Sequence, residues 1–430
     1  MITRDVALAA LNDPHAPPAV LAEIAGTYPD LWTGVAVHPQ SYPELLGWLA
    51  GRGDPGLTAT VQGVMVARQA PPAPMPPPGY PAVYPTPGVY AGAPVGIHQG
   101  KSGVQKAFDS ITGFEGEAIV RFLDLFRDTL KRHTRADMDA LMYAGTQAAR
   151  NDRQWRLPWL YSRVFLVLIS TFILLWLAMI VFSDTSGNVI PGVIFTGALV
   201  MPATLMVFFW EFNQAKNVSL FDVLRIFFTG GAMSILLLFI VSAVTDLFQT
   251  DPTQGVFDAG VEALFIGFTE EFAKAVVVFI LVRRFYGCLI SNGLLVGAVV
   301  GTGFAVFETM GYGTTGWMNG DMEQTLLLRG ILSVGGHVVW TAICGAAIML
   351  AQAPGSTQAR LGTMAWQKFI PLFCVPFLLH SLWDFSTFVA TSDVAVYSML
   401  AGLTIVAWVF IVRLINTGLR QYASLLSQNP

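Results

Sequence analysis

A pair of glutamates and a lysine stand inside an apolar stretch that is long enough to cross a lipid bilayer. Residues 268–284 read FTEEFAKAVVVFILVRR, in which Glu270, Glu271 and Lys274 have mostly apolar neighbours. Charges at membrane depth are costly, so they mark a functional site or an ion pair that joins two helices. Residues three and four positions apart share one face of a helix. The lysine can therefore neutralise one glutamate, which leaves one carboxylate in excess.

Each of the next three apolar segments also contains polar residues. Glu308 lies in GFAVFETMGY, His337 in GGHVVWTAICG, and His380 and Asp384 in LLHSLWDF. Taken alone, each has a structural explanation, because a histidine in a membrane helix often hydrogen bonds to a neighbouring helix. Together with the two glutamates and the lysine, they form a set suited to activating water or to binding a metal ion.

The composition places these residues in a membrane protein. The chain has 430 residues, of which 54% are hydrophobic and 12% charged, whereas a soluble domain carries about 25% charged residues. The formal net charge of −4 does not suggest a nucleic-acid partner. The three cysteines have neither the spacing of a zinc cluster nor that of a disulfide framework, and the first residues lack the apolar core of a signal peptide.

We expect an all-α fold with about eight transmembrane helices, because eight apolar segments of about 20 residues follow Trp159. They cover residues 160–182, 189–210, 219–244, 259–282, 289–312, 326–351, 369–390 and 394–415. The loops on one side are basic, and those on the other side are acidic except for Arg329. By the positive-inside rule the basic side is cytoplasmic. This predicts a multi-pass membrane protein with both termini in the cytoplasm.

A small helical module precedes the membrane segments, over residues 1–57. In it, Pro14–Gly26 is echoed by Pro39–Gly51 at a constant offset of 25 residues. A repeat of this length is typical of helical solenoids, and the module resembles the leucine-rich-repeat variant modules. It could bind a cytoplasmic partner, or it could be a small cap without a separate role.

Three further parts complete the predicted organisation around the membrane core of residues 157–415. Residues 58–100 are rich in proline and glycine and predict an extended linker. Residues 101–156 predict amphipathic juxtamembrane helices. One of them covers residues 118–132, where apolar residues recur at helical spacing. Residues 416–430 are expected to form a cytoplasmic tail.

Over roughly residues 157–415, the sequence resembles the PrsW-type intramembrane proteases. Residues 270–274 look like their EExxK motif, and residues 304–308 are similar to their FxxxE motif. His337 fits the third motif, and residues 380–384 fit HxxxD. The four motifs occur in order, one in each of four successive spans. This family is related to the CAAX prenyl proteases, whose first motif places a basic residue one position later.

The resemblance implies an intramembrane protease that hydrolyses a peptide bond of a membrane-anchored protein. Known members of the family are implicated in cleaving membrane-anchored anti-sigma factors, which releases a transcriptional response. Hydrolysis needs a general base, and Glu270 or Glu271 would serve, restrained by the charge of Lys274. We prefer Glu270 as the base, because its spacing from the lysine places their charges one full helical turn apart.

The remaining motif residues suggest either a metal site or its metal-free equivalent. Glu308, His337 and His380 would bind a zinc ion, or they would form a cluster that stabilises an oxyanion without metal. Two histidines and one carboxylate are a set that catalytic zinc commonly uses, so we favour zinc. Asp384 would fix the tautomer of a histidine or join the ligands.

Two functions of other classes stay open. Buried carboxylates and histidines also build proton relays in ion- or proton-coupled transporters, although the spans show no clear inverted repeat. The membrane part could also be a catalytically silent scaffold that recruits partners through residues 1–57. Proteoliposomes would separate these functions, since a protease releases cleavage products and a transporter moves solute.

Overall fold

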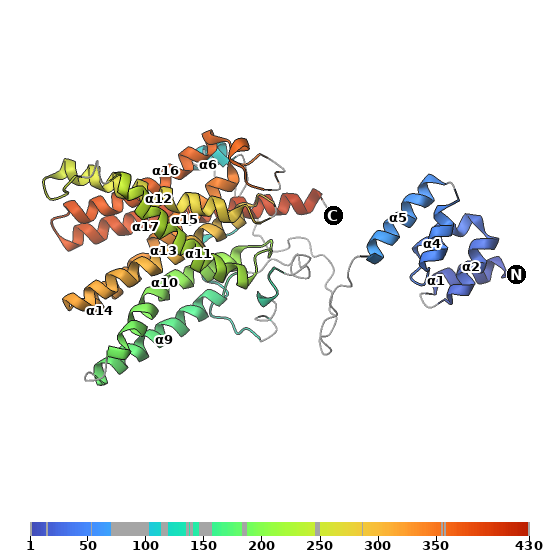
Figure 1. Ribbon diagram of the computed structural model, residues 1–430, viewed down its shortest axis with the longest axis horizontal. Helices are drawn as coiled ribbons and strands as arrows, with labels where there is room; N and C mark the ends of the chain where they lie inside the picture. The colour runs from blue at the N-terminus through green and yellow to red at the C-terminus, as the bar shows by residue number, and fades with distance from the viewer. Residues whose placement is uncertain are drawn as a thin grey trace. The chain divides into compact units, whose positions relative to one another are not determined.

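The structure is a computed structural model in which every regular element of the described residues is a helix (Figure 1). The described residues are 2–13, 16–52, 54–69, 103–112, 119–134, 137, 141–145, 157–182, 187–245, 250–285, 287–353, 356 and 358–428. The predicted all-α fold is confirmed. The chain divides into two units, residues 1–87 and residues 88–430.

The N-terminal unit is built from short helices that follow the predicted repeat. They are α1 (Arg4–Asn12), α2 (Pro18–Thr27), η1 (Pro29–Leu31), α3 (Trp32–Val37), α4 (Pro43–Ala50) and α5 (Pro55–Gln69). Both α2 and α4 begin at a proline, which is favoured at the first helical position. Equivalent residues then face the core, Leu21 and Ile24 in α2 and Leu46 and Leu49 in α4. The 25-residue offset therefore reflects a repeated helix with a repeated buried face.

The helical module extends beyond residue 57. Helix α5 continues to Gln69, and Leu57 and Val61 of this helix are buried in the core of the unit. The first part of the predicted linker is thus helical and packed. The rest of that linker, residues 70–100, lies outside the described residues.

The second unit contains the membrane helices, which run side by side (Figure 1). They are α9 (Leu160–Val181), α10 (Ile190–Phe212), α11 (Leu220–Thr245), α12 (Val256–Val282), α13 (Ile290–Asn319), α14 (Met322–Leu332), α15 (His337–Leu350), α16 (Trp366–Val389) and α17 (Asp393–Gln428). Within the described residues, seven segments are long and apolar enough to cross a membrane, counting α14 and α15 as one. Helix α12 is not among them, although it packs within the bundle, because its apolar half contains the charges at positions 270, 271 and 274.

Helices α13 and α15 form the buried centre of the bundle. They touch backbone to backbone, because glycines of α13 face the carbonyl groups of α15. A Cβ atom at Gly301 would collide with the carbonyl oxygen of His337, and one at Gly297 would collide with that of Thr341. On another face of α13, a Cβ atom at Gly303 would lie 2.8 Å from the Cα atom of Gly231 in α11. These glycines bring the helices that carry the polar motifs close together.

The sixth predicted span is interrupted. It consists of α14, a single 3₁₀ turn η5 (Ser333–Gly335), and α15, which begins at His337. Gly336 between them has φ −99° and ψ −146°, which is not a helical conformation. The break places His337 in the first turn of α15 rather than in the middle of a helix.

The predicted tail and the juxtamembrane segment pack against each other. Helix α17 continues through the predicted tail of residues 416–430 as far as Gln428. The helix predicted over residues 118–132 is wrong. After α6 (Gly103–Thr112), this segment has a short 3₁₀ helix, η2 (Phe122–Phe126), and turns within its described residues. The reason lies in α17, where the Asn416 side chain bonds the N–H and C=O groups of Val120 at 2.8 and 2.9 Å.

A buried carboxylate binds the N-terminus of the first membrane helix, α9. Glu211, at the end of α10, accepts hydrogen bonds from the backbone N–H groups of Trp159, Leu160 and Tyr161, each at 2.9 Å. These N–H groups would otherwise stay unpaired at the N-terminus of α9. The interaction ties α9 to the end of α10 and fixes where the chain enters the bundle.

We expect Gly301→Ala to lower the stability of the membrane unit by about 1–3 kcal/mol, because the added methyl group overpacks the contact with α15. The matched control is Gly311→Ala in the same helix, since nothing lies within 4 Å of a Cβ atom there. Thermal unfolding of both variants in one detergent checks this. Equal stability of the two variants would show that α13 and α15 are not in close contact.

Candidate functional site

Four helices bring all seven predicted site residues into one cluster. Helix α12 supplies three of them, α13 and α15 one each, and α16 two. They are Glu270, Glu271, Lys274, Glu308, His337, His380 and Asp384. Each lies within 4 Å of at least one other member, so the cluster is continuous.

Lys274 is the buried centre of this cluster. Its side chain has no exposed surface, and its Nζ atom lies 2.6 Å from Glu271 Oε1 and 3.3 Å from Glu270 Oε2. The same ammonium group lies 3.0 Å from Nδ1 of His337 and 4.3 Å from the centre of the Phe304 ring. An ammonium group can only donate hydrogen bonds, so Nδ1 of His337 accepts one from it.

Each histidine is oriented by its own carboxylate. His380 donates from Nδ1 to Oε1 of Glu271 at 3.0 Å. His337 donates from Nε2 to Oε2 of Glu308, also at 3.0 Å. These bonds fix the tautomer of each ring. The nitrogen that donates carries the proton, so the other ring nitrogen keeps a lone pair. A histidine held in this way by a carboxylate is the usual arrangement in metal sites.

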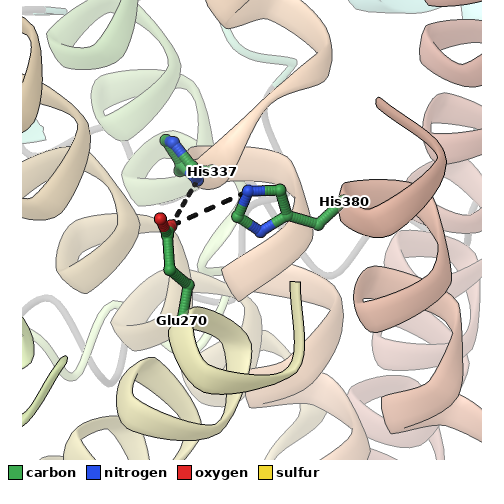
Figure 2. Close-up of side chains that lie close together, drawn as sticks. All are labelled: Glu270, His337 and His380. Carbon is green, nitrogen blue, oxygen red and sulfur yellow. Dashed lines mark ion pairs between the residues drawn. The ribbon is translucent and has the colours of Figure 1, made fainter. Parts of the chain in front are cut away.

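The two remaining ring nitrogens face the same carboxylate oxygen (Figure 2). Oε2 of Glu270 lies 3.8 Å from Nε2 of His380 and 4.0 Å from Nδ1 of His337. Each of the three residues offers one ligand atom, and these atoms all lie within 4.8 Å of one another. Within the part of the chain that the structure describes, Glu270, His337 and His380 thus form a group that could hold a metal ion.

The two other acidic residues of the cluster lie around this group. Glu308 is bonded to His337 and forms an ion pair with Arg329, so its Oε2 atom already has two donors. Asp384 has the opposite character. Its Oδ2 atom is buried and has no hydrogen-bond partner, and it lies 3.5 Å from Nε2 of His380.

A cavity of about 330 Å³ gives access to the cluster. Its polar wall contains Glu270, Glu308, His337, His380 and Asp384, while Trp340, Trp383 and Phe388 are among its apolar lining. Glu271 and Lys274 do not line the cavity and are fully buried behind it. Glu271 is therefore connected to the cavity only through the residues that it contacts.

Arg329 was not predicted as a site residue, yet it lines the same cavity. It lies on α14 and pairs with Glu308, and its Nε atom donates to Oγ1 of Thr309 at 3.1 Å. Its guanidinium group also lies over the ring of Tyr312, 4.1 Å from the ring centre. The sequence contained a signal for it, because Arg329 is the one basic residue in the predicted outer loops. The ion pair with Glu308 explains that exception.

Two parts of the chain match models of known protein families. Residues 221–415 match the model of the PrsW family intramembrane metalloprotease, and residues 5–64 match the Leucine Rich Repeat Variant domain. No curated protein and no solved structure matched. Both resemblances predicted from the motifs and the repeat are confirmed. The first match begins at residue 221, so α9 and α10 of the predicted core 157–415 lie outside it.

We expect Arg329 and Glu308 to be energetically coupled, because the cation balances a carboxylate that also holds His337. A double-mutant cycle with Arg329→Met and Glu308→Gln should give a coupling of about 1–3 kcal/mol in thermal unfolding. The matched control is Arg225→Met with Asp222→Asn, a pair in successive turns of α11 at 2.8 Å. It should give less than about 0.5 kcal/mol. Equal coupling in both cycles would contradict a special role for Arg329.

Proposed function

Because residues 221–415 match the model of the PrsW family intramembrane metalloprotease, we propose that the chain cleaves a membrane-anchored protein in the cavity beside Glu270. The observation that carries this proposal is one carboxylate oxygen facing two histidine nitrogens at the wall of that cavity. By analogy with the family, the substrate class is a membrane-anchored anti-sigma factor. Membrane proteins that accumulate in cells carrying Glu270→Gln would identify the substrate.

We propose that the metal is zinc and that its ligands are Glu270, His337 and His380 (Figure 2). The donor set fits, since two imidazoles and one carboxylate are common ligands of catalytic zinc. This set contains Glu270 in place of the predicted Glu308, because Glu308 is occupied by Arg329 and His337. When bound, the ion would polarise the scissile carbonyl group and lower the pKa of a water molecule.

The residues around these ligands hold them in place. Glu271 and Glu308 each orient one histidine, and such partners typically change metal affinity or activity by about 10–100-fold. Lys274 balances the buried carboxylates. Its hydrogen bond to Nδ1 of His337 would give way to a metal ion at that nitrogen, while its contacts with the carboxylates would stay.

With Glu270 serving as a ligand, the general base has to be another carboxylate of the cavity. We propose Asp384, because this residue lines the cavity and its buried Oδ2 atom lacks a hydrogen-bond partner. It lies beside Nε2 of His380, the nitrogen that faces Glu270. Asp384 would take a proton from the attacking water and return it to the leaving amine. The sequence analysis favoured Glu270 as the general base. The metal content of the Glu270→Gln variant distinguishes the two assignments.

We expect Asp384→Asn to lower cleavage of a membrane peptide in proteoliposomes by about 10²–10⁴-fold, as for loss of a general base, while zinc content stays at wild-type level. Glu270→Gln, His337→Ala and His380→Ala should lose both zinc and activity. Asp393→Asn is the control, since Asp393 is an exposed carboxylate at the start of α17.

Three results would overturn parts of this proposal. Stoichiometric zinc in inactive Glu270→Gln would return the role of base to Glu270. Full activity in demonstrably metal-free protein would exclude the metal. Solute flux without any cleavage product would favour the ion-coupled transporter, and the absence of both activities would favour the scaffold.

We also propose that both termini are cytoplasmic, as the basic loops suggest. In a background with all three native cysteines replaced by serine, a membrane-impermeant thiol reagent added outside should label Asn319→Cys. The reagent should leave Gln358→Cys unlabelled. Asn319 at the end of α13 and Gln358 in the segment between α15 and η6 (Leu361–Thr363) are both exposed, so accessibility within the protein does not separate them. The reverse labelling pattern would contradict this orientation.

A further inference from the structure

A second, apolar cavity of about 600 Å³ lies between α10 and α17. Side chains of α10 and α17 make up most of its lining, and η2 and Tyr161 contribute at one end. At the other end it reaches Val334 of η5. It shares no residue with the lining of the catalytic cavity. We call it the α10–α17 groove.

Among the described residues that line the groove, Arg413 is the one charged residue, and it lies at one end. Along α17 its lining runs from Thr404 to Arg413, which is about 14 Å on a helix. The hydroxyl group of Thr404 donates to a carbonyl oxygen of its own helix, and that of Tyr161 donates to the carbonyl oxygen of Leu125. The guanidinium group of Arg413 lies 5.7 Å from the ring centre of Phe108, and no carboxylate of the described residues pairs with it.

The charged end lies beside the segment that precedes the first membrane helix. In that segment, Leu123 and Leu130 are 80% and 93% exposed, which is costly in water and favourable in the headgroup region of a bilayer. This exposure argues that the charged end of the groove lies near the lipid headgroups. The opposite end of the groove lies next to the turn that leads to His337.

The lining of the groove favours an acyl chain over a transmembrane helix of a substrate, because one cation stands at the end of an otherwise apolar surface, as a phosphate stands at the end of an acyl chain. A single acyl chain is narrow enough to enter. Apolar walls without a neighbour lose dispersion contacts, and acyl chains are the molecules that the bilayer offers to fill such a space.

We propose that the α10–α17 groove binds one acyl chain of a phospholipid, whose phosphate group contacts Arg413. The chain lies against Trp408, whose Nε1 atom donates to the carbonyl oxygen of Val334 at 2.9 Å. Val334 belongs to η5, the turn immediately before the helix that carries His337. The lipid therefore packs against the side chain that is hydrogen-bonded to this turn. Binding can be measured without any assay of proteolysis.

The test uses the full chain in nanodiscs that contain a phosphatidylcholine with a diazirine near the end of one acyl chain. After irradiation, mass spectrometry should find cross-links on the α17 residues that line the groove. Val409→Trp should lower this yield at least fivefold, because the larger side chain fills the space. Val167→Trp is the matched control. Val167 lies on an exposed face of α9 outside the groove, and its substitution should leave the yield unchanged.

Arg413→Gln should lower the amount of phospholipid that stays bound in native mass spectrometry by at least threefold. Arg283→Gln is the control, since that arginine also lies against a phenylalanine ring. Equal cross-linking in Val409→Trp and Val167→Trp would overturn the proposal. Displacement of the lipid probe by a transmembrane peptide would also overturn it, because the occupant would then be a helix. Gel filtration and thermal unfolding show whether each variant is folded.

Discussion

The membrane unit depends on one buried cation. Lys274 has no exposed surface and contacts two carboxylates and a histidine. A bilayer offers no water to solvate these charges, so each must find its partner inside the protein. The lysine meets this need for Glu270 and Glu271 at once. Its position also determines which carboxylate can contact the cavity, since Glu271 is turned inward and Glu270 faces the cavity.

The same need for a partner explains the contacts of Glu308, which forms an ion pair with Arg329 and orients His337. In each histidine, one ring nitrogen thus bonds to a carboxylate and the other keeps a lone pair. Close helix packing makes this arrangement possible. Gly301 lies against the backbone of His337, so α13 and α15 approach closely enough for Glu308 to reach the imidazole ring. Packing and electrostatics are linked through this pair of helices.

Sequence reasoning predicted the spans and the members of the cluster, because hydropathy and helical spacing act locally. It did not predict which carboxylate faces which histidine. That pairing depends on the register between helices, which the glycine contacts set. The helix predicted over residues 118–132 was wrong for a similar reason, since Asn416 binds the backbone there from a distant helix. Arg329 was noticed only as an exception to a charge rule, because its partner lies on another helix.

The most direct test of this account is the unfolding stability of Lys274→Met alone and combined with Glu271→Gln, measured in one detergent. We predict that the single variant loses about 3–5 kcal/mol, because it leaves buried carboxylates without their cation. The double variant should recover most of this loss, since it removes one carboxylate charge together with the cation. If Lys274→Met is as stable as the wild type, the buried cation does not hold the site together, and the account is contradicted.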